Sequence, residues 1–199
     1  MILLIATHNA GKRREYRALL GDLDIELRSL ADIVGAPMVD EVGDTYLANA
    51  RAKAQALAAH TGVAALADDS GLEVDALDGA PGVRSARFAA DAILGAVPGD
   101  DRANLALLLE RLRRVPDERR SARFRCTIVV AHPDGRELVA DGTCEGVIAA
   151  APRGSAGFGY DPVFVYPPLG RTFAELTAAE KDRVSHRAKA VEQLRRNWW

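Results

Sequence analysis

The stretch Leu66-Ala67-Asp68-Asp69-Ser70-Gly71-Leu72 places two adjacent carboxylates directly after a short apolar run. Residues 63–67 have the pattern of a buried strand, and the Ser-Gly pair that follows predicts that the strand ends in a turn. Carboxylates at the end of a strand can hold a hard divalent cation and can take a proton from water. An acidic surface turn would have the same sequence, so the other segments of the chain decide between these two interpretations.

Length and composition describe a globular chain without a generally basic surface. At 199 residues the chain suits a single domain, 1–199. A chain of this length buries roughly 70% of its unfolded surface. Hydrophobic residues make up 48% and charged residues 27%, as in ordinary globular proteins. The formal net charge of −2 argues against a nucleic-acid-binding surface, although a local cationic pocket would not show in that total.

The cysteines and the N-terminal segment bear on the location of the protein. Cys126 and Cys144 are too few for a disulfide framework or a four-ligand zinc site, which favours a reducing compartment. Residues 1–6 are apolar but carry no basic leader, and they are far shorter than a signal core or a membrane span. We therefore expect a cytoplasmic protein that has neither a membrane nor a nucleic acid as a partner.

Hydrophobic periodicity predicts βα units early in the chain and strands of antiparallel character later. Asp44 is the candidate cap of the second helix, and Thr61-Gly62 is expected to end it. Residues 79–88 are expected to form a loop, and residues 177–180 fit a capping box. This order predicts a mixed α/β sheet with helices packed on it. Strands are expected at 2–6, 25–30, 63–67, 124–130 and 137–149, and helices at 13–20, 45–60, 102–114 and from 177 onward.

The turn after the first strand, Thr7-His8-Asn9-Ala10-Gly11-Lys12, has the composition of an anion-binding turn. Backbone N–H groups at a helix start attract phosphate, and Lys12 adds a point charge. The turn is not a P-loop, because the first glycine is missing and Arg13 follows the lysine. An ordinary surface turn between a strand and a helix would look similar.

Glu41 precedes the second helix and can face the same site as Asp69. Two carboxylates with phosphate oxygens and waters form a typical magnesium site. A single loop glutamate is more often solvated, and a lysine in the middle of a helix, such as Lys53, more often faces solvent. Both residues belong to the site only if their side chains point toward it.

The most unusual segment is Pro152-Arg153-Gly154-Ser155-Ala156-Gly157-Phe158-Gly159-Tyr160-Asp161-Pro162. Glycines on both sides of Phe158 free the backbone and leave the ring open on one face. Phe158 can therefore stack on a nucleobase, and Asp161 can accept an N–H from the edge of that base. The alternative is a Gly/Pro-rich loop that aromatic packing fixes in place.

The segment Ser185-His186-Arg187 opens the last helix, and Lys181 precedes it by one short turn. The start of a helix suits the binding of an anion or a carbonyl oxygen, because the macrodipole assists the donor side chains. A single basic helix start is more often solvated, but this cluster would supply several hydrogen-bond donors together.

Taken together, these motifs resemble the Ham1/RdgB-like family of inosine/xanthosine triphosphate pyrophosphatases. They occur in order over nearly the whole chain, and the ordered set is far more specific than any single piece. The matching pieces are residues 7–12, Glu41 with Asn49 and Ala50, residues 67–72, 79–82, 85–87 and 157–162, and Lys181 with residues 185–187.

The resemblance implies a fold, an activity and an assembly. The implied fold is an elongated, mixed central sheet flanked by helices, with the nucleotide site in a cleft between two lobes. The implied activity is Mg²⁺-dependent hydrolysis of dITP, ITP and XTP to the monophosphate and pyrophosphate, which clears deaminated purines before they enter DNA or RNA. The implied assembly is a homodimer.

The resemblance also implies roles for single residues. Asp69 would be the proton acceptor and, with Glu41, a ligand of the magnesium ion. The positions of Lys53 and Asp68 leave their roles open. The residues implied in nucleotide binding are Thr7, His8, Asn9, Ala10, Gly11, Lys12, Ser70, Phe158, Gly159, Tyr160, Asp161, Lys181, His186 and Arg187.

Two other functions remain open at the level of sequence. A Maf-like nucleotide pyrophosphatase would use related chemistry with another base preference, and the His186-Arg187 pair and residues 157–161 argue against it. A non-catalytic nucleotide sensor would not need both Glu41 and Asp69. Turnover in the presence of magnesium would distinguish an enzyme from a sensor.

Overall fold

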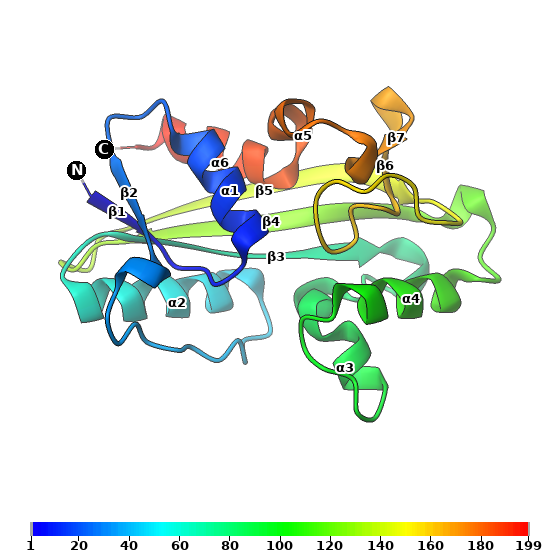
Figure 1. Ribbon diagram of the computed structural model, residues 1–199, viewed down its shortest axis with the longest axis horizontal. Helices are drawn as coiled ribbons and strands as arrows, with labels where there is room; N and C mark the ends of the chain where they lie inside the picture. Colours follow the sequence, from blue (N-terminus) through cyan, green and yellow to red (C-terminus); the bar gives the residue numbers. More distant parts are fainter. Residues whose placement is uncertain (1, 199) are drawn as a thin grey trace. The chain divides into compact units, whose positions relative to one another are not determined.

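The computed structural model describes residues 2–198, in which seven strands form one mixed sheet beside helices (Figure 1). The strand order is β2-β1-β3-β4-β5-β6-β7. β1 pairs in parallel with β2 and β3, whereas β6 pairs antiparallel with β5 and β7. The mixed α/β sheet predicted from the sequence is therefore confirmed. The strands are β1 Ile2–Ile5, β2 Glu26–Ser29, β3 Ala65–Val74, β4 Ser121–Ala131, β5 Glu137–Ile148, β6 Phe164–Tyr166 and β7 Arg171–Thr172.

The helices α1, α2 and α4 begin and end, and α5 begins, within about three residues of the predicted positions, whereas α3 was not predicted. Within residues 2–198, none of them combines the length and the apolar character that crossing a bilayer requires. Short 3₁₀ segments connect several elements, including residues 82–87, which the sequence suggested to be a loop. The α-helices are α1 Ala10–Leu20, α2 Tyr46–Thr61, α3 Phe88–Ala92, α4 Asp101–Leu112, α5 Ala178–Val184 and α6 His186–Arg196.

Contacts within the chain divide it into two compact units. Unit 1 contains the described residues up to Asp69, together with 126–142 and 186–198. Unit 2 contains residues 70–125 and 143–185. The long strands β3, β4 and β5 contribute residues to both units, so the chain passes from one unit to the other within strands.

Unit 1 has an apolar cluster on each face of its strands. On one face, Leu3 and Ile5 of β1 pack with Tyr16 and Leu20 of α1 and with residues of α6. On the other face, Leu4 packs in a second cluster with residues of α2. Successive side chains of a strand point to opposite faces, so one apolar run supplies both clusters. Figure 1 shows α1 and α6 on one side of these strands and α2 on the other.

Unit 2 is built around one apolar cluster rich in aromatic rings. The rings of Phe124 and Phe164 lie 4.5 Å apart between centroids, and the rings of Phe164 and Phe173 lie 4.9 Å apart. Leu108 and Leu112 of α4 are fully buried in the same cluster. Burying rings of this size contributes a large share of the apolar area of a small core. These contacts fix α4 and β6 in the unit.

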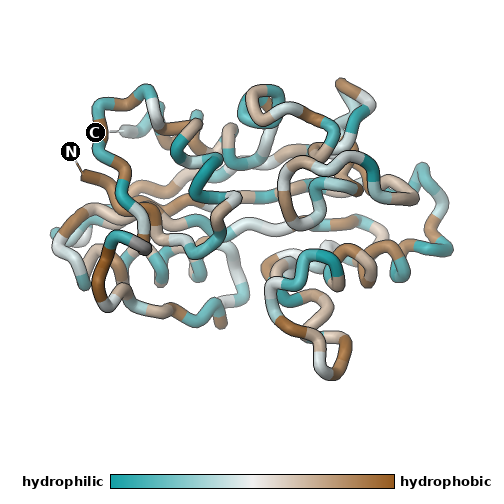
Figure 2. Tube along the Cα trace, in the orientation of Figure 1, coloured by the Kyte–Doolittle hydropathy of each residue, from teal (hydrophilic) through white to brown (hydrophobic). Residues whose placement is uncertain are grey.

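Exposed hydrophobic side chains concentrate in two loops. One is the segment that leads into α2, where Val34 and Met38 are nearly fully exposed. The other is the loop that follows α3, where Leu94 and Val97 are exposed. The hydropathy colours of Figure 2 show hydrophobic positions along this loop. Large apolar side chains at loop tips favour contact with another surface.

Capping residues explain most of the helix boundaries, with one correction. Thr45, not Asp44, caps α2, because the Thr45 hydroxyl accepts the Ala48 N–H at 3.1 Å. Gly62 ends this helix in the left-handed conformation (φ 68°), as the Thr-Gly pair predicted. The capping box predicted at residues 177–180 is confirmed at the start of α5.

The prediction of a turn at the acidic pair is wrong. β3 continues through Asp68, Asp69 and the Ser70-Gly71 pair as one strand. Beyond the pairing with β1, the N–H of Leu72 donates to the Ser85 hydroxyl at 2.9 Å. On its other edge β3 neighbours β4, and Ser85 adds this bond, so the extended backbone keeps hydrogen-bond partners after the pairing with β1 ends. A local turn signal cannot reveal a partner that lies 13 residues away.

Candidate functional site

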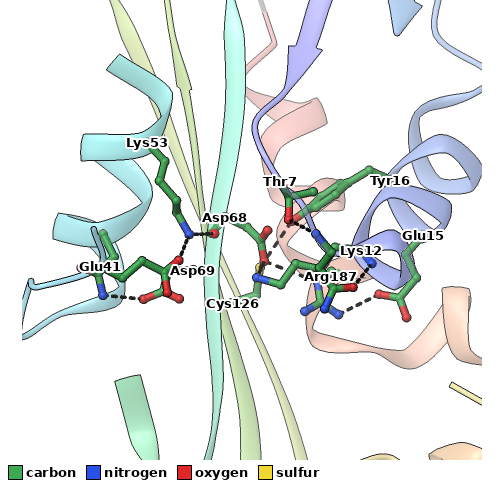
Figure 3. Close-up of polar contacts among 12 residues, drawn as sticks. Thr7, Lys12, Glu15, Tyr16, Glu41, Lys53, Asp68, Asp69, Cys126 and Arg187 are labelled. Carbon is green, nitrogen blue, oxygen red and sulfur yellow. Dashed lines mark hydrogen bonds and ion pairs between the residues drawn. The ribbon is translucent and has the colours of Figure 1, made fainter. Parts of the chain in front are cut away.

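The two adjacent carboxylates of β3 point to opposite faces of unit 1. Leu66 belongs to the cluster beside α1 and α6, whereas Ala67 belongs to the cluster beside α2. Because side chains alternate along a strand, Asp68 continues the row of Leu66 and Asp69 continues the row of Ala67. Figure 3 shows Lys12 and Arg187 on one side of the strand, and Glu41 and Lys53 on the other. The acidic pair therefore serves two different sets of contacts.

Asp68 is enclosed by cationic side chains from α1 and α6. Its Oδ2 atom lies 2.9 Å from Lys12 Nζ and 3.4 Å from Arg187 Nε, and its side chain is 1% exposed. Burial opposes ionisation, but the charges of Lys12, Arg187 and Lys53 hold the pKa of Asp68 well below its usual range. Asp68 is therefore a permanent negative charge that fixes Lys12 and Arg187.

Arg187 has a second carboxylate partner on α1. Its Nη1 atom lies 2.7 Å from Glu15 Oε2, and its side chain is 4% exposed. Burial would favour a neutral guanidinium, but the charges of Glu15 and Asp68 raise the pKa of Arg187. A guanidinium held by two carboxylates keeps one orientation, since its donors lie in a rigid plane.

Tyr16 and Cys126 close the apolar side of this network. Cys126 Sγ lies 3.8 Å from the Tyr16 hydroxyl and 3.9 Å from Asp68 Oδ2. Burial, followed by the charge of Asp68, raises the pKa of Cys126 to about 12. The thiol therefore stays neutral and packs as a small apolar group.

On the other face, α2 holds Asp69 through Asn49. The Asn49 Nδ2 atom donates to Asp69 Oδ2 at 2.9 Å, and its Oδ1 atom accepts the Gly43 N–H at 2.8 Å. A side chain at position 43 would collide with Asn49, because an added Cβ would lie 2.7 Å from Oδ1. Asn49 thus ties both the loop before α2 and the Asp69 carboxylate to one helix.

Lys53 lies one turn further along α2, so it shares the face of Asn49. Its ammonium forms an ion pair with Glu41 and donates to the Asp68 carbonyl oxygen at 2.7 Å. Burial alone would lower the pKa of Lys53, but the charges of Asp68, Glu41 and Asp69 raise it. The structure therefore places Lys53 in the acidic site, away from the solvent-facing position that is usual in a helix.

Asp69 has the electrostatic character of a proton acceptor. Its pKa is raised chiefly by burial and further by the nearby charge of Glu41, whereas Lys53, Lys12 and the hydrogen bond from Asn49 oppose that rise. A carboxylate with a raised pKa is a stronger base than an exposed one. Lys53 keeps the pKa of Glu41 below its usual value in spite of burial.

The carboxylates of Glu41 and Asp69 suit a hard cation that is also coordinated by oxygen atoms of a bound molecule. Their charges lie close enough to affect each other. Within residues 2–198, however, no group of three or more His, Cys, Asp or Glu side chains is arranged to hold a metal ion alone. Mg²⁺ commonly uses one or two carboxylates and takes its other oxygens from phosphate and water. The donor set therefore fits a magnesium ion that a phosphorylated ligand helps to hold.

The first turn leads directly into α1. Asn9 is the N-cap of the helix, because its Oδ1 atom accepts the Lys12 N–H at 3.0 Å, and the Thr7 hydroxyl accepts the Asn9 N–H at 3.2 Å. Gly11 is buried, whereas His8, Asn9 and Ala10 are exposed. The turn thus aims Lys12 at Asp68 and leaves its other residues open to a ligand.

In unit 2, the glycine-rich segment wraps around a buried carboxylate. Asp161 is 2% exposed, and its Oδ2 atom accepts the Phe158 N–H at 3.0 Å and pairs with Lys181. The Lys181 ammonium lies 4.9 Å from the centroid of the Phe158 ring. At Gly157 an added Cβ would lie 1.9 Å from Asp161 Oδ2, so only glycine allows this close approach.

The remaining predicted site residues lie at element boundaries. Ser70 is the first residue of β3 in unit 2. His186 is buried at the first position of α6, where its carbonyl oxygen would lie 2.0 Å from a Cβ at position 142. Gly142 therefore lets the start of α6 lie directly against β5. Tyr160 is buried, and its hydroxyl donates to the Ser85 carbonyl at 2.9 Å.

The structure groups the predicted residues within each unit. In unit 1, Lys12 and Arg187 share Asp68, while Glu41 and Asp69 lie beside Lys53. Four residues that connect these groups have no definite role predicted from the sequence, namely Glu15, Asn49, Lys53 and Asp68. Two signals were present in the sequence: the spacing of four residues between Asn49 and Lys53, and the alternation of side chains along β3.

Comparison with known sequences identifies the family. The sequence model of the Ham1 family matches residues 3–197. This chain belongs to the Ham1 family. Among its relatives, a dITP/XTP pyrophosphatase of Exiguobacterium sibiricum is 50% identical over 194 residues, which is 98% of this chain and 95% of that protein. A dITP/XTP pyrophosphatase of Geobacillus kaustophilus is 48% identical and covers 98% of this chain and 93% of its own length.

Solved structures of Ham1 proteins share the fold. The HAM1 protein of Coxiella burnetii superimposes with a TM-score of 0.84 at 41% identity, covering 98% of this chain and 96% of that one. A nucleoside-triphosphatase / dITP/XTP pyrophosphatase of Mycobacterium abscessus gives a TM-score of 0.75 at 46% identity, covering 98% and 97%. The family resemblance inferred from the motifs is confirmed over nearly the whole chain.

Proposed function

We propose that this Ham1-family protein hydrolyses dITP, ITP and XTP to the nucleoside monophosphate and pyrophosphate. The relatives named above are dITP/XTP pyrophosphatases and match almost the full chain. The observation that carries the proposal is Asp69, a buried carboxylate with a raised pKa that Asn49 orients beside Lys53. Such a group is suited to accept the proton of an attacking water.

The proposed reaction is the attack of water on the α-phosphorus with pyrophosphate as the leaving group. Asp69 takes the proton from the water as the new P–O bond forms. Lys12 and Lys53 offset the charge of the phosphate chain, which is the main electrostatic demand of phosphoryl transfer. Because Asn49 fixes the carboxylate of Asp69, this general base is already oriented before substrate binds, and less conformational entropy is lost in the reaction.

We propose that Glu41 and Asp69 hold a magnesium ion together with the substrate. When bound, such an ion would polarise the phosphate and neutralise its charge. The two carboxylates provide hard oxygen ligands, and Lys53 shows that a cation already occupies the neighbourhood of Glu41. Asn49 holds the Asp69 carboxylate in one orientation beside Glu41 and Lys53, where it can serve as a ligand of the ion.

Base selectivity is proposed to rest on the edge of a 6-oxopurine. This edge presents a carbonyl acceptor and an N1–H donor, and adenine reverses both. Within unit 2, Asp161 or a backbone carbonyl would accept the N1–H, and Phe158 would stack on the ring. Adenine would leave such buried polar groups unpaired, which costs more than a lost contact on an open surface.

The proposed cellular role is the removal of deaminated purine nucleotides before they enter DNA or RNA. We further propose that the protein works as a homodimer in the cytoplasm and needs neither a membrane nor a nucleic acid. The exposed apolar side chains in the two loops are consistent with a partner surface. Light scattering on a size-exclusion column at several concentrations tests the dimer.

The deciding experiment measures pyrophosphate release from ITP, XTP, dITP, ATP and GTP with Mg²⁺, for the wild type and for Asp69→Asn. We expect a strong preference for the deaminated purines and a loss on the order of a hundredfold or more in the variant. Binding without turnover in the wild type would favour a nucleotide sensor. Rapid hydrolysis of other nucleotides would favour Maf-like chemistry.

A further inference from the structure

Asp101, in the first turn of α4, contacts the glycine-rich segment from a distant part of the chain. Its Oδ2 atom accepts the Gly159 N–H at 2.8 Å, although the two residues are 58 positions apart. No motif in the sequence predicts a role for residues 90–101. The neighbouring residue, Asp100, caps the helix by accepting the Ala103 N–H at 3.0 Å. The cap is thus supplied by one aspartate, and the carboxylate of the next reaches the loop.

The start of α4 is a firm support for such a contact. Asn104, one turn along the same helix, is 2% exposed. Its Oδ1 atom accepts the Ala89 N–H at 2.7 Å, and its Nδ2 atom donates to the Ala86 carbonyl at 3.2 Å. These bonds join α4 to the 3₁₀ segment and to α3, so the carboxylate of Asp101 starts from a fixed backbone.

The contact completes a set of anchors around Phe158. The Phe158 N–H is held by Asp161, and the Gly159 N–H by Asp101, so two consecutive amides each bind a carboxylate. The Tyr160 hydroxyl adds a third anchor through the Ser85 carbonyl. Gly159 has a positive φ of 62°, and no atom lies within 4 Å of the Cβ that another residue would add, so this backbone is open on one side. The loop therefore presents Phe158 from a backbone fixed on both sides.

We propose that Asp101 is a positioning residue that fixes the Gly159 amide and, through it, the orientation of the Phe158 ring. The inference rests on the proposed function, in which Phe158 stacks on the purine. Asp101 does not touch the substrate in this scheme. It keeps the aromatic platform in the orientation that the base requires, so its loss weakens binding of the base and leaves the chemical step unchanged.

The test compares Asp101→Ala with Asp101→Asn. Alanine removes the acceptor, whereas asparagine keeps an oxygen that can accept the Gly159 N–H. We expect Asp101→Ala to raise the KM for ITP and the Kd for inosine monophosphate by about tenfold, roughly the loss of one hydrogen bond, with kcat changed by less than about twofold. Asp101→Asn should restore both constants to near the wild-type values. The Gly159 amide resonance should shift in the alanine variant and return in the asparagine variant.

Asp100→Ala is the matched control, because it weakens the same helix without touching the loop. It should lower the Tm through loss of the cap and leave the Kd for inosine monophosphate unchanged. If Asp101→Ala also left that Kd unchanged while Phe158→Ala raised it, the positioning role would be wrong and the proposed function would stand. If neither variant changed it, the base-stacking role of the loop would fail, and the present inference with it. Equal weakening by Asp100→Ala and Asp101→Ala would reduce Asp101 to a structural residue of α4.

Discussion

At the scale of single residues, the surroundings of the neighbouring Asp68 and Asp69 shift the two carboxyl pKa values in opposite directions. Asp68 is stabilised as an anion by Lys12 and Arg187, so its folded pKa is lowered. Asp69 is disfavoured as an anion by burial, so its folded pKa is raised. A lowered carboxyl pKa contributes stability above the unfolded pKa, and that stability is lost as the pH falls toward the folded value. A raised carboxyl pKa has the reverse effect: it costs stability as the pH rises through the folded value.

The same neutralising substitution should therefore act in opposite directions at the two positions. Asp68→Asn leaves Lys12 and Arg187 with one partner fewer and should lower the free energy of unfolding at pH 7 by about 3 kcal/mol. Asp69→Asn removes a buried charge and should raise the Tm at pH 7. Urea and thermal denaturation of both variants, side by side, measure this. A loss of stability in both would show that the two side chains share one environment.

The pH dependence of turnover follows from the raised pKa of Asp69. A general base works in its ionised form, so kcat/KM should rise with pH through the pKa of this carboxyl and then level off. That midpoint should lie above the ordinary value for an aspartate, because burial raises it. Asn49→Ala removes a hydrogen bond that favours the ionised form, and should move the midpoint to still higher pH. An unchanged midpoint would mean that another group limits the rate.

At the scale of elements, α2 presents Asn49 and Lys53 on one face, and Lys53 neutralises Glu41. A metal ion at Glu41 has to compete with this ammonium. Lys53→Met should therefore bind Mn²⁺, as a spectroscopic substitute for Mg²⁺, more tightly than the wild type in the absence of nucleotide. Electron paramagnetic resonance titration measures it, and Lys189→Met, at an exposed position of α6, is the control. Weaker binding in Lys53→Met would show that the lysine supports the metal site rather than competing with the ion.

Most of the longer elements were predictable from the sequence, whereas the short elements α3, β6 and β7 and most side-chain contacts were not. The capping box of α5 and the glycine end of α2 are local signals, and both are confirmed. The Ser-Gly pair at 70–71 predicted a turn that does not form, because β3 has partners in other segments: β4 beside it, and the Ser85 hydroxyl that accepts the Leu72 N–H. Lys53 could not be assigned to the site from sequence, because the assignment depends on which face of α2 packs against β3. The contact of Asp101 joins residues too far apart for any local pattern to show.

At the scale of the whole molecule, both units draw on the same three long strands. Phe173 lies fully buried in the aromatic cluster of unit 2, and Phe173→Ala should lower the free energy of unfolding by about 3 to 5 kcal/mol, as measured by urea denaturation.

Because β3, β4 and β5 continue into unit 1, we expect the two units to unfold together. Tryptophan fluorescence, which comes from the adjacent pair Trp198 and Trp199 of the sequence, should then follow the same denaturation curve as circular dichroism. Two separated transitions would show that the units unfold independently.

The ion pairs of unit 1 also bear on the stability of the protein when no nucleotide is bound. Lys12, Lys53 and Arg187 each have a carboxylate partner within the chain. An enzyme whose substrates are rare has no nucleotide bound for most of the time. With its cations already matched by its own anions, the protein does not depend on a bound nucleotide to balance their charge during these long intervals. The side chains that are proposed to bind the substrate therefore also stabilise the folded protein while no substrate is bound.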